Sequence, residues 1–271
     1  MGTKTHVTLP GAGPPRRAAR LRCLLALLRE RHEATPAELA AHLGVSGATV
    51  RRDLADLEQR MLVHRTHGRV RVVDAEHHEL PVTLRDGQFR DAKRRIATYA
   101  ATLVPPGRHG VAINGGSTAA EVARALGSHA GLTAMTNSLS TALQLAARPQ
   151  LRVVVNGGWL RQQSHELVGP LAEAAFSSTR FGTALLGADG VSASVGATTH
   201  DETEARVNRQ MVLHADRVVI VADGSKVGRI TDASFAAAGE LHDLVTDATA
   251  PPGEVLRLRG LGVRVHVVAA G

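Results

Sequence analysis

Residues 35–54 read TPAELAAHLGVSGATVRRDL, and this stretch decides the fold of the N-terminal part of the chain. Thr35 and Glu38 have the spacing of a capping box, with a proline at the first helical position, which predicts a short helix over 36–43. Gly44 suits the turn that ends this helix. A second helix follows within a few residues. Two helices joined by a tight glycine-containing turn form a helix-turn-helix unit, whose second helix enters the DNA major groove.

The second helix of this unit begins after Ser46, a favoured N-cap residue. At about 100° per residue, Val50, Leu54 and Leu57 fall on one face and must meet the core. Arg52 lies on the opposite face, near the helix end that meets base edges, so we expect it to read a base. An isolated arginine pair is more often a solvated helix face, but the helix-turn spacing favours DNA. The residues expected to contact phosphates are Ser46, Thr49 and Arg51.

Two more elements complete the unit. Leucines at i, i+3, i+4 and i+7 predict a helix over 16–31. After the second helix-turn-helix helix, two short β-rich runs surround His67-Gly68 and predict a hairpin. Such a hairpin would form a wing that lays three arginines against the DNA backbone or minor groove, namely Arg65, Arg69 and Arg71. His64 and His67 have no carboxylate or cysteine at ligand spacing, so no metal site is expected.

The positive charge is confined to one end of the chain. The net charge is +7, from 32 Lys and Arg against 25 Asp and Glu. Residues 1–73 hold 13 Lys and Arg against 6 Asp and Glu, whereas residues 74–271 hold 19 of each. Solubility alone gives no reason for this asymmetry. It indicates one module that meets a polyanion and another that does not.

Length and composition limit the class of protein. The 271 residues favour two domains, and the single cysteine, Cys23, excludes a disulfide framework and a cysteine-based zinc site. The single cysteine is most simply explained by a reducing, cytosolic compartment, so we expect a cytoplasmic protein. The apolar run 24–28 is too short to span a bilayer and has no small-residue cleavage site after it, so we expect no signal peptide, no membrane anchor and no membrane partner. The predicted organisation is a disordered tail over 1–15, a winged helix-turn-helix domain over 16–73, a linker over 74–91 and a larger domain over 92–271.

The larger domain alternates between strand and helix patterns. Near-continuous apolar strands separated by helices, such as those expected over 91–103 and 119–126, predict a mostly parallel α/β sheet covered on both faces. The strands are expected at 111–113, 132–135, 151–155, 183–186, 217–222, 244–246 and 263–268. Ligands of such sheets bind outside the carboxyl ends of the strands.

Polar turns follow three of these strands. Asn114-Gly115-Gly116-Ser117-Thr118 opens a helix N-terminus, where backbone N–H groups attract a phosphate, although a capping box and a tight turn would also explain it. Thr136-Asn137-Ser138 and Asp223-Gly224-Ser225-Lys226 are the other two. Lys226 is one of only three lysines beside 29 arginines, and a compact ammonium here suits a phosphate or sugar oxygen. A surface turn lysine is the alternative.

Motifs for nucleotide chemistry are missing from the sequence. It contains no P-loop and no dinucleotide Gly-x-Gly-x-x-Gly, so ATP and NAD are not expected and no cofactor is predicted. Acidic candidates remain at Asp189, after a strand, and in the run 200–204. That run could equally be a charged helix surface.

Residues 45–54 followed by His67-Gly68 closely resemble the N-terminal signature of DeoR-type bacterial transcriptional regulators. The chain has Arg69 where the family usually has a second glycine. Further matches follow in the family's order and spacing, at Lys93, 115–118, 136–138, Asn156-Gly157-Gly158, Val168-Gly169-Pro170, Gly187-Ala188-Asp189-Gly190 and 223–226. Asn114 stands where the family usually has Asp.

The resemblance implies a sensor domain similar to ribose-5-phosphate isomerase, a phosphorylated sugar as effector, and a homo-oligomer commonly built on dimers. The residues expected at the effector site are Lys93, Asn114, Gly115, Gly116, Ser117, Thr118, Thr136, Asn137, Ser138, Gly158, Asp189, Glu204, Asp223, Ser225 and Lys226. The stretch 198–209 resembles members that control amino-sugar or galactose-type pathways.

We therefore expect a transcriptional regulator, with a repressor favoured, that binds double-stranded operator DNA of a carbohydrate-metabolism operon. Two other hypotheses stay open. One is a sugar-phosphate isomerase with a basic appendage, which would need a positioned carboxylate base. The other is a constitutive DNA binder whose sensor site has degenerated. Effector titration of operator binding and an isomerase assay separate all three.

Overall fold

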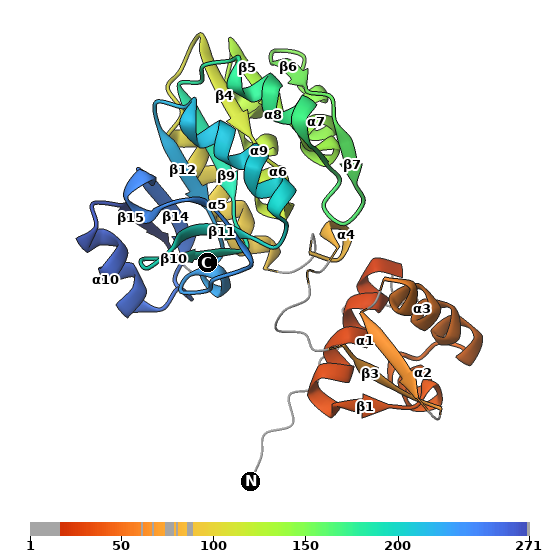
Figure 1. Cartoon of the computed structure of the whole chain (residues 1–271). Coiled ribbons are helices and arrows are strands. Elements are labelled where there is room, and N and C mark those ends of the chain that lie inside the picture. The colour runs from red at the N-terminus through yellow and green to blue at the C-terminus, as the bar shows by residue number, and fades with distance from the viewer. Residues whose placement is uncertain are drawn as a thin grey trace. The chain divides into compact units, whose positions relative to one another are not determined.

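The computed structural model describes residues 17–60, 62–66, 68–73, 79, 81–85 and 89–269 (Figure 1). Its contacts divide the chain into two units that meet between Leu84 and Arg85. The expected tail over 1–15 and His67 of the expected turn lie outside the described residues, as do residues 74–78, 80 and 86–88 of the expected linker. The described part of that linker includes a short helix, α4 (Val82–Arg85), which its sequence pattern did not predict.

The first unit is a winged helix-turn-helix. Its elements are α1 (Arg17–Arg31), β1 (Glu33–Ala34), α2 (Pro36–Leu43), α3 (Gly47–Gln59), β2 (Val63–Thr66) and β3 (Arg69–Val72). The three strands form an antiparallel sheet in the order β1-β3-β2. The predicted hairpin is therefore confirmed, and β1 adds a third strand that is too short to show an alternating pattern.

Local sequence signals set the helix boundaries as expected. Thr35 and Glu38 form the reciprocal capping box. The Thr35 backbone nitrogen donates to the Glu38 side chain at 2.7 Å, and the Glu38 backbone nitrogen donates to the Thr35 hydroxyl at 3.2 Å. Gly44 ends α2 with φ at +63°, a conformation that glycine adopts without steric cost. Ser46 caps α3. Val50 and Leu54 are fully buried, so the predicted core face of α3 is confirmed.

The second unit is built on a seven-stranded sheet in the order β15-β14-β12-β9-β4-β5-β6, in which every neighbouring pair is parallel. Its strands are β4 (His109–Ile113), β5 (Leu132–Thr136), β6 (Arg152–Val155), β9 (Thr183–Gly187), β12 (Val218–Val221), β14 (Asp243–Asp247) and β15 (Arg264–Val268). The predicted α/β class and all seven expected strands are confirmed.

Two apolar layers hold this sheet between helices (Figure 1). The helices are α5 (Arg90–Thr102), α6 (Ser117–Ala125), α7 (Leu139–Ala146), α8 (Pro170–Ser177), α9 (Glu202–Leu213) and α10 (Pro252–Gly260). Val111 and Ile113 point into the layer under α5, α6 and α7, whereas Ala112 points into the layer under α8, α9 and α10. This alternation buries both faces of the strands, which explains their continuous apolar runs.

Smaller elements lie at the rim of the sheet. They are the hairpin β7 (Trp159–Arg161) and β8 (Glu166–Val168), the sheet of β10 (Gly190–Ser192), β11 (Gly196–Thr199) and β13 (Ala233–Ala236), and short 3₁₀ turns at Leu126–Ser128, Gly224–Lys226 and Ala238–Glu240. The β7-β8 hairpin carries Trp159 with its side chain 75% exposed. In the part of the chain described here, every helix is too short or too polar to cross a membrane.

Candidate functional site

The exposed face of α3 is the candidate DNA-binding surface of the first unit. Arg51 and Arg52 are both exposed, and within the ranges that the structure describes neither forms an ion pair. The Ser46 hydroxyl accepts a hydrogen bond from the Thr49 backbone nitrogen at 3.2 Å and lies 2.9 Å from the Thr49 hydroxyl. The predicted base reader and its neighbours therefore surround the N-terminal end of one helix. Two uncompensated guanidinium groups at that end can bind phosphate or a base edge.

Asp53 fixes the orientation of this face. Its side chain is 2% exposed and accepts a hydrogen bond from Arg20 Nη2 on α1 at 3.1 Å. Arg17 Nε lies 3.8 Å from the same carboxylate. Because these contacts tie α3 to α1 at the residue next to Arg52, rotation of α3 would break a buried ion pair. The sequence motif contained Asp53, but its spacing gave no indication of this partner.

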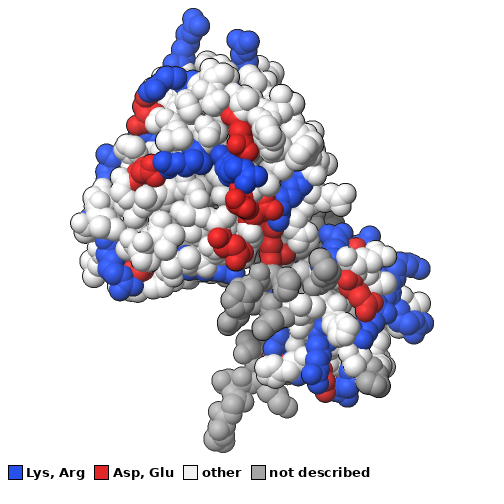
Figure 2. All heavy atoms as spheres, viewed as in Figure 1, with Lys and Arg blue, Asp and Glu red and all other residues white. Residues whose placement is uncertain are grey.

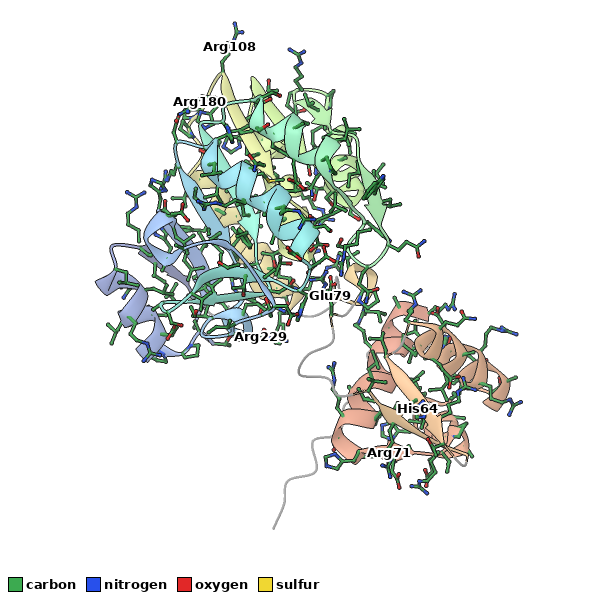
Figure 3. All side chains as sticks on the ribbon, in the orientation of Figure 1. His64, Arg71, Glu79, Arg108, Arg180 and Arg229 are labelled. Atoms are coloured by element: carbon green, nitrogen blue, oxygen red, sulfur yellow. The ribbon has the colours of Figure 1, made fainter. Side chains whose placement is uncertain are left out.

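The wing arginines are paired within the unit. Arg69 and Arg71 both contact Glu33 on β1, at 2.8 and 2.6 Å. The hydrogen bond from Arg71 is the main reason that the pKa of Glu33 lies below its ordinary value. Arg65 Nη2 donates to the Arg51 carbonyl at 3.2 Å. Figure 2 shows Lys and Arg side chains on the surface of this unit, and Figure 3 labels Arg71, whose side chain is 69% exposed. Exposed ion pairs of this kind are weak.

Strand ends of the second unit bring several predicted effector residues together. Asn114, after β4, donates to the Gly187 carbonyl at 3.0 Å and accepts from the Gly187 backbone nitrogen at 2.8 Å, which joins the ends of β4 and β9. An ionised Asp at this position could make only the second of these bonds. Asn114 therefore has a structural role that accounts for the departure from the family's usual residue.

A buried carboxylate occupies the glycine turn that precedes α6. A Cβ on Gly115 would lie only 2.3 Å from Glu166 Oε1, so glycine is needed at this position for Glu166 to approach. Glu166 Oε2 also accepts a hydrogen bond from Asn137 Nδ2 at 2.9 Å. The turn expected to attract a phosphate therefore already faces a buried carboxyl group. Glu166 was not among the residues expected at this site.

The segment after β5 contributes one side chain to this region and uses the other two locally. Thr136 Oγ1 accepts from the Ser138 backbone nitrogen at 3.1 Å, and Ser138 caps α7. The Asn137 side chain reaches across to Glu166, and the backbone of Ser138 forms a β-bridge with Glu166. Gly158 is packed against the Val168 backbone in the β7-β8 region, where a Cβ would clash. This packing explains why glycine is needed at position 158, and it is a structural role.

Asp189 is the centre of the charged part of the site. Arg85 Nη1 lies 2.9 Å from its Oδ1 atom, and Lys226 Nζ lies 3.8 Å from the same oxygen. The Thr199 hydroxyl is 3.2 Å from Oδ2. Burial opposes ionisation of Asp189, but the charge of Arg85, followed by that of Lys226, outweighs it and holds the pKa of this carboxyl below its ordinary value. Two cations therefore share one carboxylate, and the trio carries a net positive charge.

Glu204 lies beside Asp189 and competes with it for a hydrogen-bond donor. The Thr199 hydroxyl is 3.1 Å from Glu204 Oε2 and 3.2 Å from Asp189 Oδ2, but it has one hydrogen and can donate to only one of them. Arg161 of the β7-β8 hairpin contacts Glu204 at 2.8 Å and Asp201 at 2.9 Å. A ligand hydroxyl is a group that could supply a further donor between the two carboxylates.

Lys226 is positioned by a tightly packed turn. Asp223 accepts from the Ser225 backbone nitrogen at 3.2 Å, and Asp247 accepts from the Gly224 backbone nitrogen at 2.9 Å. A Cβ on Gly224 would lie 2.3 Å from the Ala250 backbone nitrogen, so the turn tolerates only glycine here. Burial lowers the pKa of Lys226, although Asp189 acts against this shift. A partly dehydrated ammonium of this kind favours an anionic partner.

Lys93 is buried on α5, at 4% exposure, and its Nζ donates to the Arg85 carbonyl at 3.0 Å. It therefore supports the segment that carries Arg85. Ser117 and Thr118 form the first turn of α6, and Thr118 is buried. Apart from Thr136, Ser138 and Gly158, which are used locally, the predicted residues that make side-chain contacts form two groups, one around Glu166 and Asn137 and one around Asp189 and Lys226.

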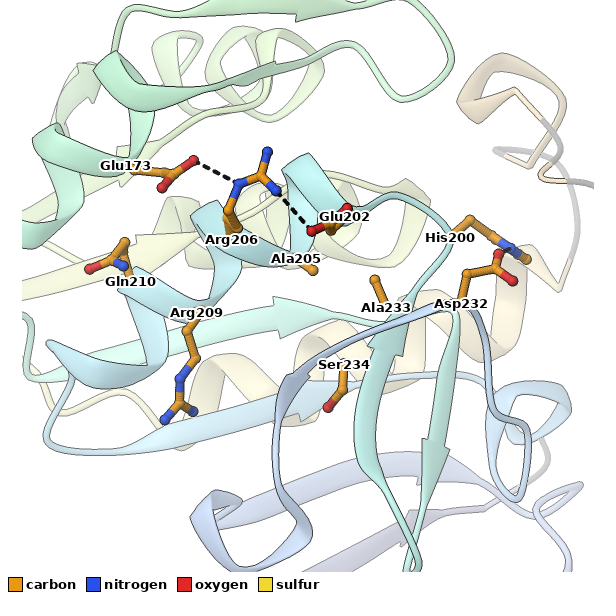
Figure 4. A pocket seen from close by; sticks show the side chains of 10 residues that line it. All are labelled: Glu173, His200, Glu202, Ala205, Arg206, Arg209, Gln210, Asp232, Ala233 and Ser234. Carbon is orange, nitrogen blue, oxygen red and sulfur yellow. Dashed lines mark hydrogen bonds and ion pairs between the residues drawn. The ribbon is translucent and has the colours of Figure 1, made fainter.

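A separate pocket of about 580 Å³ lies beside α9, on a face of this helix that does not carry Glu204 (Figure 4). It is lined by Glu173, His200, Glu202, Ala205, Arg206, Arg209, Gln210, Asp232, Ala233 and Ser234. Arg206 lies 3.3 Å from Glu173 and 3.2 Å from Glu202, and His200 lies 3.2 Å from Asp232. These pairs leave a lining of both signs. The predicted effector residues do not contribute to this pocket.

Four residues that contact the predicted site residues were not predicted from the sequence, namely Arg85, Arg161, Glu166 and Thr199. Arg85 stands in a segment with the composition of a linker, and Arg161 and Glu166 belong to the strands of a hairpin too short for an alternating pattern. Thr199 lies beside the acidic run 200–204, whose clustering was the one available signal for this part of the site.

Comparisons with known proteins match both units. The model of the DeoR-like helix-turn-helix domain matches residues 20–76, and that of the DeoR C terminal sensor domain matches residues 88–248. The HTH-type transcriptional regulator GlpR of Haloferax volcanii is 35% identical over 92% of this chain and 96% of its own length. The HTH-type transcriptional repressor CsqR of Escherichia coli is 30% identical over 89% and 92%. The glycerol-3-phosphate regulon repressor of the same species is 28% identical over 87% and 92%.

Likeness to solved structures is lower. The sorbitol operon regulator SorC of Klebsiella pneumoniae has a TM-score of 0.40 and 13% identity, over 90% of this chain and 99% of that chain. Ribose 5-phosphate isomerase A of Neisseria gonorrhoeae has a TM-score of 0.37 and 19% identity, over 52% of this chain and 53% of that chain. The matched family is one of regulators without enzymatic activity. The chain belongs to the DeoR family of DNA-binding transcriptional regulators, with a helix-turn-helix domain followed by the family's C-terminal sensor domain.

Proposed function

We propose that the protein represses a carbohydrate-metabolism operon, that α3 reads its operator, and that a phosphorylated sugar bound at the strand ends of the sensor domain releases it. In this proposal Arg52 contacts a base, while Ser46, Thr49 and Arg51 contact phosphates. The wing arginines exchange Glu33 for the DNA backbone. The names of the repressors among its relatives support repression over activation.

One observation carries the effector assignment. Asp189 and Glu204 compete for the single hydroxyl hydrogen of Thr199, directly beside the cations Arg85 and Lys226. A sugar supplies hydroxyl donors for the carboxylates, and a phosphate supplies the anion for the cations. We assign the phosphate to Lys226 and the α6 turn, and the sugar hydroxyls to Asp189 and Glu204. The carboxylate of Glu166 against Gly115 favours Lys226 as the stronger of the two phosphate contacts.

Thermal unfolding with a panel of hexose 6-phosphates, hexose 1-phosphates and glycerol 3-phosphate tests this assignment. A compound present at 100 times its Kd should add about 2.7 kcal/mol to the free energy of unfolding. The same compound should release operator DNA in a titration, whereas the unphosphorylated sugar should not. Operator binding that no member of the panel changes would favour a constitutive DNA binder.

We further propose that the protein acts as a homodimer or a higher oligomer. Exposed apolar side chains support this proposal, because Val155 on the edge strand β6 and Trp159 and Leu160 on the hairpin are 44%, 75% and 48% exposed. Exposed apolar side chains of neighbouring elements are typical of protein interfaces. Light scattering of the full chain measures the mass directly, and a monomer at micromolar concentration would count against the proposal.

A further inference from the structure

Leu84 and Arg85 are consecutive residues whose side chains belong to different units. Leu84 is 1% exposed and belongs to the apolar core of the DNA-binding unit. Arg85 is the first residue of the sensor unit, and its side chain is 14% exposed. Both lie on the one-turn helix α4. Because their Cα atoms can be only about 3.8 Å apart, a displacement of one backbone is passed to the other.

The sensor unit holds Arg85 at two points. Its guanidinium lies 2.9 Å from Asp189 Oδ1, and its backbone carbonyl accepts a hydrogen bond from Lys93 Nζ at 3.0 Å. Asp189 and Lys93 come from different elements, the segment after β9 and helix α5. Closure of this pair therefore ties the start of the sensor chain to the ligand-binding edge of the sheet.

An effector cannot use Asp189 without affecting this pair. Asp189 Oδ1 is shared by Arg85 and Lys226, and Oδ2 lies beside the Thr199 hydroxyl. A sugar hydroxyl that donates to the carboxylate competes with these donors, and a phosphate that draws Lys226 or Arg85 competes with the carboxylate itself. Arg85 makes the shorter of the two ion pairs, 2.9 Å against 3.8 Å for Lys226, so a ligand that takes the place of Arg85 at Oδ1 breaks the closer of the two contacts.

We propose that the Arg85–Asp189 ion pair is the contact through which effector binding reaches the DNA-binding unit. The inference rests on the proposed function, because the ligand is the phosphorylated sugar assigned above. With the pair closed, the chain at Leu84 is held in the operator-binding arrangement. When the effector takes over Asp189, Arg85 leaves the carboxylate and Leu84 moves with it. The pair is thus a positioning contact that differs between the two functional states, which is what an effector needs in order to shift their equilibrium.

Breaking the pair from either side should imitate the effector. Operator Kd is measured by fluorescence anisotropy, with and without the panel compound that stabilises the parent, for Arg85→Gln, Asp189→Asn, the double variant and the parent. Both single variants should show the operator Kd of the effector-loaded parent before any compound is added. The operator Kd should therefore be higher than that of the effector-free parent, by the factor of about 5 to 150 that is typical of coupled sites. The double variant should match the single variants, because the same contact is lost in all three.

Arg94→Ala is the matched control, since Arg94 is an exposed arginine on α5 outside this pair, and it should behave as the parent does. Thermal melts establish that each variant is folded. Arg85→Lys retains the charge, so it should respond to the compound more than Arg85→Gln does. Effector-free operator affinity equal to the parent's in folded Arg85→Gln and Asp189→Asn would overturn the inference.

The two proposals fail in different ways. If no compound of the panel affects the parent, the phosphorylated-sugar assignment is wrong, yet the effector-free affinities of the variants still test the pair. If a compound releases the parent from operator DNA and raises the operator Kd of Arg85→Gln by the same factor, the effector assignment stands. In that case the ion pair does not transmit effector binding.

Discussion

Arg52 and Asp53 are adjacent on α3 but differ in burial and in their contacts. Asp53 is buried and held by Arg20, whereas Arg52 is exposed and has no ion pair among the described residues. The step of about 100° between neighbours on a helix allows Asp53 to anchor the helix while Arg52, the residue before it, stays at the surface. The helix is therefore held in place by Asp53, and in the part of the chain that the structure describes the guanidinium of Arg52 is not used in a contact that stabilises the fold.

Arg52→Ala should lower specific operator binding by about 1 to 3 kcal/mol and relax the preference at one base pair, because a bidentate base contact is lost. Affinity is measured on operator and on scrambled DNA at one salt concentration. Gln59→Ala, at the exposed far end of the same helix, is the control. Equal losses on both DNAs would reassign Arg52 to a phosphate.

Lys226→Met removes a charge-assisted contact with little change in side-chain length. Effector affinity should therefore fall by roughly 1.5 to 3 kcal/mol, and the regulator should stay on its operator at effector concentrations that release the parent. Calorimetry with the active panel compound measures the loss, and Lys226→Arg should retain part of the affinity. Unchanged release would make Lys226 an ordinary turn lysine.

At the scale of elements, the sequence predicted the helices and strands better than their partners. Caps and apolar periodicity are local signals, so α2, α3 and the seven strands of the main sheet could all be read directly. The contacts of Arg85 and Glu166 with residues more than twenty positions away depend on packing that no local pattern encodes. The two-residue strand β1 was missed for a related reason, because it exists only through its pairing with β3.

The Asp243 cluster shows how charged contacts fasten the starts of neighbouring strands. Asp243 on β14 is fully buried and lies 2.7 Å from Arg217 Nε, 2.9 Å from Arg264 Nη2 and 2.8 Å from His266 Nε2. Burial raises the pKa of Asp243, but the hydrogen bonds from Arg264, Arg217 and His266 outweigh it and hold that pKa well below its ordinary value. The ionised carboxylate therefore stabilises this end of the sheet.

Asp243→Asn should lower the free energy of unfolding at neutral pH by about 2 to 3 kcal/mol, because it leaves two arginines without their carboxylate. The folded-state pKa lies below the unfolded value of about 3.9, so the stabilisation is complete above that pH and is lost as the pH falls through the folded value. Urea unfolding should show the gap between parent and variant narrowing in acid. Asp216→Asn, in an exposed pair with Arg180, should change little. A gap that stays constant with pH would contradict the assignment.

The charge distribution of the whole molecule separates DNA binding from sensing. All of the net positive charge lies in residues 1–73. Operator binding should therefore weaken steeply with salt, with a log–log slope of about −5 for six phosphate contacts, while a fragment from residue 74 onward should not bind DNA. Filter binding over a salt series measures the slope. A flat response, or DNA retained by the fragment, would remove the electrostatic basis of the proposal.

Trp159 gives the molecule an optical property of its own. It is the single tryptophan of the chain and is 75% exposed, and its hairpin also carries Arg161 and Glu166, which contact Glu204 and Asn137 of the proposed effector site. Its fluorescence should therefore have the red-shifted emission of a hydrated indole and should be quenched readily by iodide. A blue shift on concentration would report self-association through the hairpin, and a change on adding a sugar phosphate would report the hairpin's response to the ligand, without any attached dye.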